Sequence, residues 1–200
     1  MTDQHSTEAR ARVLDAAEQL FSEHGYKSVT LRDIAKAVGI KHASLYHHAP
    51  DGKEALFVEV TERGLRRHQA GLEAAIQQAE PRIEAQLEAA AHWLLAQPVL
   101  DFGRMMSSDM PAIGEVHARR LSEIAYASVM QPIQQIFRQA AARGEIKCAN
   151  AGLLAGGLLA LVESIHHLPA HIATQPKTGM VDAWIDVIVN GLRPNPTTAY

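Results

Sequence analysis

Apolar residues recur every three or four positions along almost the whole chain, and no stretch alternates apolar and polar residues for long enough to form a strand. This spacing predicts an all-α protein of about nine helices. Glycines, prolines and capping residues bound the expected helices. These cover residues 7–24, 30–38, 42–48, 51–79, 82–96, a short piece around 102–106, 111–143 with a kink near Pro132, 150–168 and 180–191.

The stretch 30–53 carries the most specific pattern in the chain. Thr30 is expected to cap a helix in which Asp33, three residues later, completes a capping box. Gly39 is expected to end that helix, because glycine adopts a left-handed conformation at little cost. A second helix over residues 42–48 follows. Two short helices joined by a glycine turn predict a helix-turn-helix unit, whose second helix can enter the major groove of DNA.

Polar and positively charged side chains gather on the second of these helices, while Leu45 is expected to face inward. Side chains at its N-terminal end are assigned to base edges, namely Lys41, His42 and Ser44. Donors suited to phosphate oxygens are Thr30, Tyr46, His47 and Lys53. Arg32 and Ala43 complete the predicted DNA-binding set. The alternative interpretation is a plain pair of surface helices.

A longer pattern surrounds this unit, made of Phe21, Gly25, Tyr26, Thr30, Ile34, Ala35, Gly39, Ile40, Leu45, Tyr46, His48, Lys53 and Leu56. In register, these residues resemble the DNA-binding domain of the TetR (tetracycline-repressor-like) family of bacterial regulators. The resemblance covers the first 57 residues or so. Ala49 departs from it, because the family usually has a large aromatic residue there, and Gly52 replaces a usual Ser or Lys. The first departure predicts looser packing beneath the second helix.

The resemblance implies an N-terminal three-helix DNA-binding domain over residues 7–57, with its recognition unit at 30–49. A C-terminal helical ligand-binding and dimerisation domain over 58–193 and a flexible tail over 194–200 complete the expected organisation. Relatives bind an inducer within the middle helices and pair through their last two long helices.

Methionine, aromatic and a few polar side chains in the middle helices fit a mostly apolar pocket for a small apolar or amphipathic ligand. The predicted ligand-binding residues are Trp93, Phe102, Met105, Met106, His117, Tyr126 and His166. For each residue singly, a plain core position is the alternative. The pocket is therefore argued chiefly from the resemblance.

The last two helices carry more apolar surface than one small domain readily buries. Residues 154, 158, 161, 165 and 168 form an apolar stripe, and Gly152, Gly156 and Ala160 form a second stripe of small residues. The final helix is marked by Met180, Trp184, Val187, Ile188 and Gly191. Self-association through a symmetric four-helix interface is expected, with ordinary core helices of a monomer as the alternative.

Charge and cysteine content add modest constraints. The net charge of −3 counts mildly against nucleic-acid binding, although positive groups cluster locally within residues 41–53. The single cysteine, Cys148, excludes an internal disulfide framework and suits a reducing cytosol. The polar N-terminus and the absence of a membrane-length apolar run predict a cytoplasmic protein.

The sequence shows no phosphate-binding glycine loop, nucleophile elbow or zinc-protease pair, so neither an enzyme nor a cofactor is expected. A metal site built on His166, His167 and His171 remains a minor alternative. The preferred hypothesis is a dimeric, ligand-responsive regulator, most often a repressor, that binds a palindromic double-stranded operator. A helical small-molecule carrier without operator function is the alternative.

Overall fold

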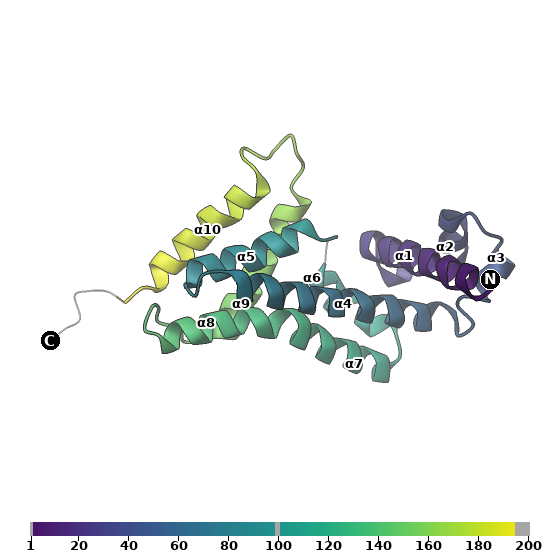
Figure 1. The fold of residues 1–200 in the computed structure, drawn as a ribbon, viewed down its shortest axis with the longest axis horizontal. Helices are drawn as coiled ribbons and strands as arrows, with labels where there is room; N and C mark the ends of the chain where they lie inside the picture. Colours follow the sequence, from purple (N-terminus) through teal and green to yellow (C-terminus); the bar gives the residue numbers. More distant parts are fainter. Residues whose placement is uncertain (1, 99–100, 195–200) are drawn as a thin grey trace. The chain divides into compact units, whose positions relative to one another are not determined.

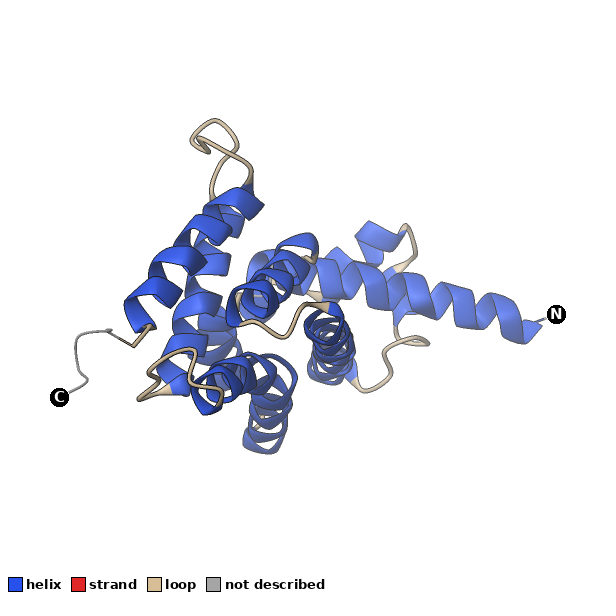
Figure 2. Cartoon of the chain, turned by 60° about the vertical axis from the view of Figure 1, so that its left-hand side comes forward, coloured by secondary structure: helices blue, strands red, loops and turns tan. Residues whose placement is uncertain are grey.

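The computed structural model describes residues 2–98 and 101–194, and for residues 2–6 it describes the backbone alone. This described part consists of helices, turns and loops without a strand, which confirms the all-α prediction (Figure 2). The predicted tail lies, apart from residue 194, outside the described residues.

The helices follow one another along the chain with short connections (Figure 1). Their bounds are α1 Thr2–Ser28, α2 Leu31–Val38, α3 His42–Leu45, α4 Gly52–Gln78, α5 Ile83–Ala96, α6 Phe102–Arg104, α7 Glu115–Ala125, α8 Gln131–Ala142, α9 Ala151–His167 and α10 Lys177–Leu192. Two π-helical turns, η1 Met105–Asp109 and η3 Tyr126–Met130, and the 3-10 turn η2 Met110–Ala112 complete the set. Helix α1 begins at Thr2 rather than at the expected Thr7, and it is interrupted at Gly25, where φ is 78°.

The described chain divides into two compact units, and α4 contributes to both. The first unit comprises residues 2–66 and 101–124, and the second comprises residues 67–98 and 125–194. The boundary expected between residues 57 and 58 falls inside α4. Residues 101–124, which the sequence assigned to the second domain, group with the N-terminal residues.

The core of the first unit forms where α1 meets the start of α4. Val13, Ala17 and Phe21 line the buried side of α1. The Phe21 and Phe57 rings meet edge to face with centroids 5.2 Å apart, and Tyr26 lies 4.9 Å from Phe57. Aromatic pairs in these geometries contribute beyond the area they bury. This aromatic cluster joins α1 to the start of α4, and α2 and α3 follow α1 in the same unit.

In the second unit α5 packs against α8, α9 and α10. Its buried residues include the four that the spacing predicted, namely Ile83, Leu87, Ala91 and Leu94, together with Gln86 and Ala90. The Trp93 ring lies directly against the backbone of α4, because a Cβ added at Gly71 would come within 1.9 Å of Trp93 Cζ2. Only glycine leaves room for that close approach.

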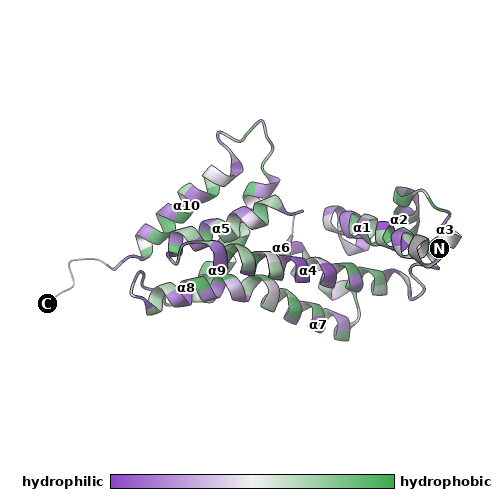
Figure 3. Ribbon diagram, viewed as in Figure 1, coloured by the Kyte–Doolittle hydropathy of each residue, from purple (hydrophilic) through white to green (hydrophobic). Residues whose placement is uncertain are grey.

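Apolar side chains are unevenly buried in α7 and α9. At the start of α7, the Val116 side chain is 79% exposed. In α9 the buried residues are Ala155, Leu158, Leu159, Val162 and Ile165, whereas Leu154 and Leu161 of the predicted stripe are only partly covered. The reason is visible in the hydropathy of α9, which is apolar around most of its circumference, so spacing alone does not select a face (Figure 3).

A π-helical turn interrupts the regular helix directly before Pro132, where the sequence predicted a kink. In this turn, η3, the N–H of Gln131 bonds to the carbonyl of Tyr126. Proline lacks an N–H and its ring clashes with the carbonyl four residues earlier, so a wider turn at this point accommodates it.

Candidate DNA-binding surface

Helix α2 begins and ends as its sequence predicts. Thr30 caps it, with Oγ1 accepting the Asp33 N–H at 3.3 Å, while Asp33 Oδ2 accepts the Thr30 N–H at 2.9 Å. The Thr30 hydroxyl also donates to Asp33 Oδ2 at 2.6 Å, and these bonds lower the pKa of the Asp33 carboxyl. Gly39 closes the helix with φ 76° and ψ 28°. The capping box and the glycine turn are therefore confirmed.

Helix α3 is shorter than predicted. Its regular part covers one turn, His42–Leu45, and residues 46–48 continue as a turn in which His48 N–H bonds to the Leu45 carbonyl at 2.8 Å. Leu45 has no exposed surface and anchors the helix, as expected. Ala49 is 5% exposed and follows it into the core. The small Ala49 side chain thus fills a buried position where the family has a larger one.

Most predicted DNA-contact side chains lie on the exposed side of this helix-turn-helix unit, residues 30–49. Thr30, Arg32, Lys41, Ala43, Tyr46 and His47 are exposed, and His42 and Ser44 are partly covered. Tyr46 keeps 49% of its surface in solvent, and its ring meets that of His42 at a centroid distance of 5.3 Å. The structure thus brings cations, hydroxyls and an aromatic ring together over a buried leucine.

Lys53 is placed differently from these residues. Its Nζ donates to the carbonyls of Tyr26 at 2.7 Å and Val29 at 2.9 Å, and it lies 4.2 Å from the centre of the Tyr26 ring. Burial lowers the pKa of its ammonium group. Lys53 therefore holds the connection between α1 and α2, a role that the sequence analysis missed.

Comparison with known proteins agrees with this geometry. Residues 13–60 match the family model for bacterial regulatory proteins of the tetR family. Residues 13–60 thus carry a domain of the TetR family. The transcriptional repressor KstR2 of Rhodococcus jostii is 49% identical over 51 residues, which are 26% of this chain and 24% of KstR2. The chain thus matches only about a quarter of the length of such curated relatives.

Solved structures extend the likeness to the fold of nearly the whole chain. A tetR-family regulatory protein from Rhodococcus RHA1 superimposes with a TM-score of 0.73 at 17% identity, covering 94% of this chain and 98% of the other. AibR, solved in complex with isovaleryl coenzyme A and operator DNA, gives 0.72 at 17% identity over 90% of this chain and 97% of its own. At this identity the likeness establishes the fold alone.

Glu54 links the base of the helix-turn-helix domain to residues 101–124. Its Oε1 accepts the Gly114 N–H at 2.9 Å and lies 2.9 Å from His117 Nδ1. These two bonds, the backbone one first, lower the pKa of the Glu54 carboxyl. The carboxylate therefore links the first turn of α4 to the start of α7.

Acid is expected to weaken this link. Because the folded-state pKa of Glu54 is lowered, its contribution to stability is full above the ordinary glutamate pKa of about 4.3 and is lost as the pH falls through the folded value. Glu54→Gln is expected to make the free energy of unfolding less dependent on pH between about 5 and 3. Urea titrations across that range measure this. His117→Gln, which keeps the Gly114 bond, is expected to have the smaller effect, and the reverse order would contradict the assignment.

The predicted ligand residues divide between the two units. Phe102, Met105, Met106 and His117 belong to the first unit, and Trp93, Tyr126 and His166 belong to the second. Several already have partners within the chain. The Tyr126 hydroxyl donates to Gln134 Oε1 at 3.0 Å, and His166 Nε2 lies 3.0 Å from the Gln97 carbonyl oxygen.

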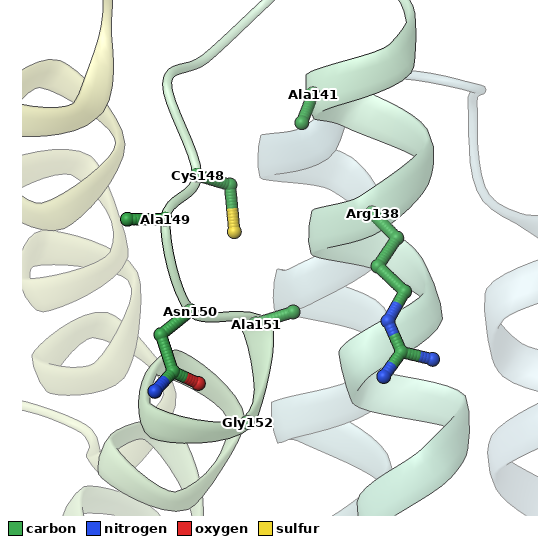
Figure 4. Close-up of a pocket in the computed structure, with 7 residues that line it drawn as sticks. All are labelled: Arg138, Ala141, Cys148, Ala149, Asn150, Ala151 and Gly152. Atoms are coloured by element: carbon green, nitrogen blue, oxygen red, sulfur yellow. The ribbon is translucent and has the colours of Figure 1, made fainter.

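A hollow of about 390 Å³ lies in the second unit, between α8 and the start of α9 (Figure 4). Arg138 and Ala141 line one side, and the segment 148–152, with Cys148, lines the other. None of the seven predicted ligand residues lines it. Sequence reasoning did not single out this hollow, because its residues are small or polar and carry no periodic signal.

Two further observations concern other kinds of site. Among the described residues, no three His, Cys, Asp or Glu side chains group closely enough to hold a metal ion. His167 Nδ1 instead lies 2.9 Å from the Glu163 carbonyl oxygen. Within residues 2–98 and 101–194, no helix has the length and apolarity that a membrane span requires.

Proposed function

We propose that the chain is a transcriptional repressor that binds a palindromic operator as a homodimer and is released by a small-molecule ligand. One observation carries the DNA-binding part: an exposed basic and hydroxyl-rich helix, held by buried Leu45, sits in a capped helix-turn-helix unit of TetR type. The chain acts in the cytoplasm, where operator DNA is found.

The roles of individual side chains follow from their exposure. Lys41, His42, Ala43 and Ser44 face base edges in the major groove, and Arg32, Tyr46 and His47 bind phosphate oxygens. Thr30 contributes through its position at the start of α2, since its hydroxyl already donates to Asp33. Lys53 supports the helix-turn-helix unit from beneath instead of contacting phosphate, because its ammonium group is bonded to two backbone carbonyls.

Dimerisation uses the exposed apolar faces of α9 and α10. On α9, Leu153 is 72% exposed and shares its side with Gly157 and Ala160. On α10, Val187 is 67% exposed and shares its side with Ala183 and Gly191. Large side chains flanked by small ones permit close packing of a second copy, and two-fold pairing supplies the two reading helices that a palindrome requires.

Ligand control rests on the fold. AibR, which shares this fold, was solved with both isovaleryl coenzyme A and operator DNA. In our proposal, a ligand binds better to a conformation in which the two helix-turn-helix units are wrongly spaced for the operator. That differential affinity lowers the affinity for DNA.

Gel mobility shifts on a duplex selected from a random pool test the DNA-binding role. Lys41→Ala and Tyr46→Ala are each expected to weaken binding by about 5- to 150-fold, which corresponds to about 1–3 kcal/mol. Lys147→Ala, an exposed cation in the second unit, is the matched control and is expected to bind as the wild type does. Unchanged affinity in both Lys41→Ala and Tyr46→Ala would refute these contacts. A wild-type protein that selects no duplex would favour the alternative, a small-molecule carrier without operator function.

A further inference from the structure

Two side chains from residues 101–114 hold the end of α1. The Arg104 guanidinium donates to three successive carbonyls, those of Phe21 at 3.2 Å, Ser22 at 2.5 Å and Glu23 at 3.4 Å. These carbonyls lie in the last turn before the break at Gly25, where a side-chain donor can supplement the hydrogen bonds of the helix. Arg104 therefore caps α1 from outside.

Asp109 holds the other side of the same break. Its side chain is only 6% exposed, and its Oδ1 accepts the Tyr26 N–H at 2.8 Å. Its Oδ2 lies 3.6 Å from Arg104 Nε, so the two side chains also pair with each other. We refer to Arg104 and Asp109, bonded in this way on either side of Gly25, as the clasp.

Gly25 is closely enclosed by the clasp. Its φ of 78° is a conformation that side chains disfavour, and a Cβ added there would meet Asp109 Oδ1 at 3.2 Å and Arg104 Cδ at 3.3 Å. The clasp thus fits the turn that leads from α1 through Tyr26 to α2. Tyr26 is in turn bonded through its carbonyl to Lys53, so the clasp acts on the base of the helix-turn-helix unit.

The clasp depends on the π-helical turn η1. In that turn the Met110 N–H bonds to the Met105 carbonyl, a spacing of five residues. Because each hydrogen bond of a π-helical turn spans five residues, Arg104 and Asp109, which are also five residues apart, project from the same side of the helix. In an α-helix, with 3.6 residues per turn, the same two residues would point about 140° apart. In the α-helical register, therefore, Arg104 and Asp109 cannot both contact α1.

We propose that η1 is a register switch: in its π-helical register Arg104 and Asp109 together position the helix-turn-helix unit, and a shift to the α-helical register withdraws Asp109 from Tyr26. Arg104 and Asp109 are thus positioning residues that act on DNA binding through the α1–α2 turn. Two predicted ligand residues, Met105 and Met106, lie on η1, and a third, Phe102, lies on α6 directly before it. A ligand that packs against these residues better in one register raises the population of that register and lowers that of the other.

This inference rests on the proposed function for its biological meaning, but its first test needs no DNA. Amide hydrogen exchange at Tyr26 in the full chain reports directly on the clasp. Asp109→Ala removes the acceptor, and the Tyr26 amide is expected to exchange about tenfold faster. Ser107→Ala is the control on the same turn, since its exposed hydroxyl bonds only to the Gly103 carbonyl, and it is expected to leave that rate unchanged.

Deletion of Ser107 separates a switch from a merely structural contact. Removing one residue from η1 places Arg104 and Asp109 four apart, so an α-helix can then keep both on one side. The deletion variant is expected to exchange the Tyr26 amide as slowly as the wild type or several-fold more slowly, because the clasp no longer needs the π register. Faster exchange in a folded deletion variant, or unchanged exchange in Asp109→Ala, would overturn the proposal.

Operator affinity supplies the second arm, measured on the duplex selected by the wild type. Asp109→Ala is expected to bind it about tenfold more weakly, and the Ser107 deletion is expected to bind as the wild type does. Should the wild type select no duplex, the proposed function fails while the exchange results still decide the switch. If the Ser107 deletion does not fold, Arg104→Met replaces it, with faster Tyr26 exchange expected and unchanged exchange contradicting the clasp.

Discussion

Leu45→Ala is expected to lower the free energy of unfolding by about 2–5 kcal/mol and to abolish operator binding. Leu45 has no exposed surface and is the residue by which α3 is anchored in the core of the first unit. Its truncation removes buried methyl groups and leaves a cavity beneath a helix of a single turn. Because a helix of one turn has little stability of its own, the geometry of α3 depends on Leu45.

Urea denaturation and gel mobility shifts of the same variant measure both effects. Tyr46→Ala is the matched control, because Tyr46 is the next residue and is 49% exposed. It is expected to weaken DNA binding while changing the free energy of unfolding by about 0.5 kcal/mol or less. A Leu45→Ala protein that loses less than about 1 kcal/mol would show that α3 is not anchored in this way.

Lys53→Met is expected to cost about 3 kcal/mol of stability, because hydrogen bonds that involve a charged group contribute about 1.5–3 kcal/mol. Methionine keeps the length of the side chain but offers no donor, so the carbonyls of Tyr26 and Val29 lose their partner. The connection between α1 and α2 loosens, and operator affinity is expected to fall with it.

The salt dependence of binding separates this supporting role from a phosphate contact. A lost phosphate contact lowers the slope of log affinity against log salt by about one, as is expected for Arg32→Met. For Lys53→Met the affinity is expected to fall at every salt concentration with the slope unchanged. A slope reduced by about one, together with unchanged stability, would restore the phosphate contact first predicted for Lys53.

Local signals predicted local structure well. The cap at Thr30 and the glycine turn at Gly39 depend on residues at most five positions apart, so a sequence pattern contains all that is needed. In α5 the spacing predicted four of the six buried residues and missed Gln86 and Ala90. Helices α5 and α9 both carry apolar residues on more than one side, so the neighbours that pack on them decide which face is buried.

Contacts distant in sequence were not predictable. Lys53 bonds to carbonyls 24 and 27 residues earlier, and Asp109 bonds to an amide 83 residues earlier. Backbone carbonyls and amides carry no sequence signature, so neither partner could be inferred from residue type. The same limit applies to the ligand site, for which residue chemistry suggested seven side chains but carries no information on which of them lie together.

Hydroxyl-radical footprinting of the full chain on its selected duplex tests the central claim most directly. Two protected segments are expected, related by the two-fold axis of the palindrome and spaced by about 10–10.5 base pairs or a multiple of this. Both should vanish together in Leu45→Ala and weaken together in Lys41→Ala. A single protected segment, or protection that both variants retain, would contradict DNA reading by paired α3 helices.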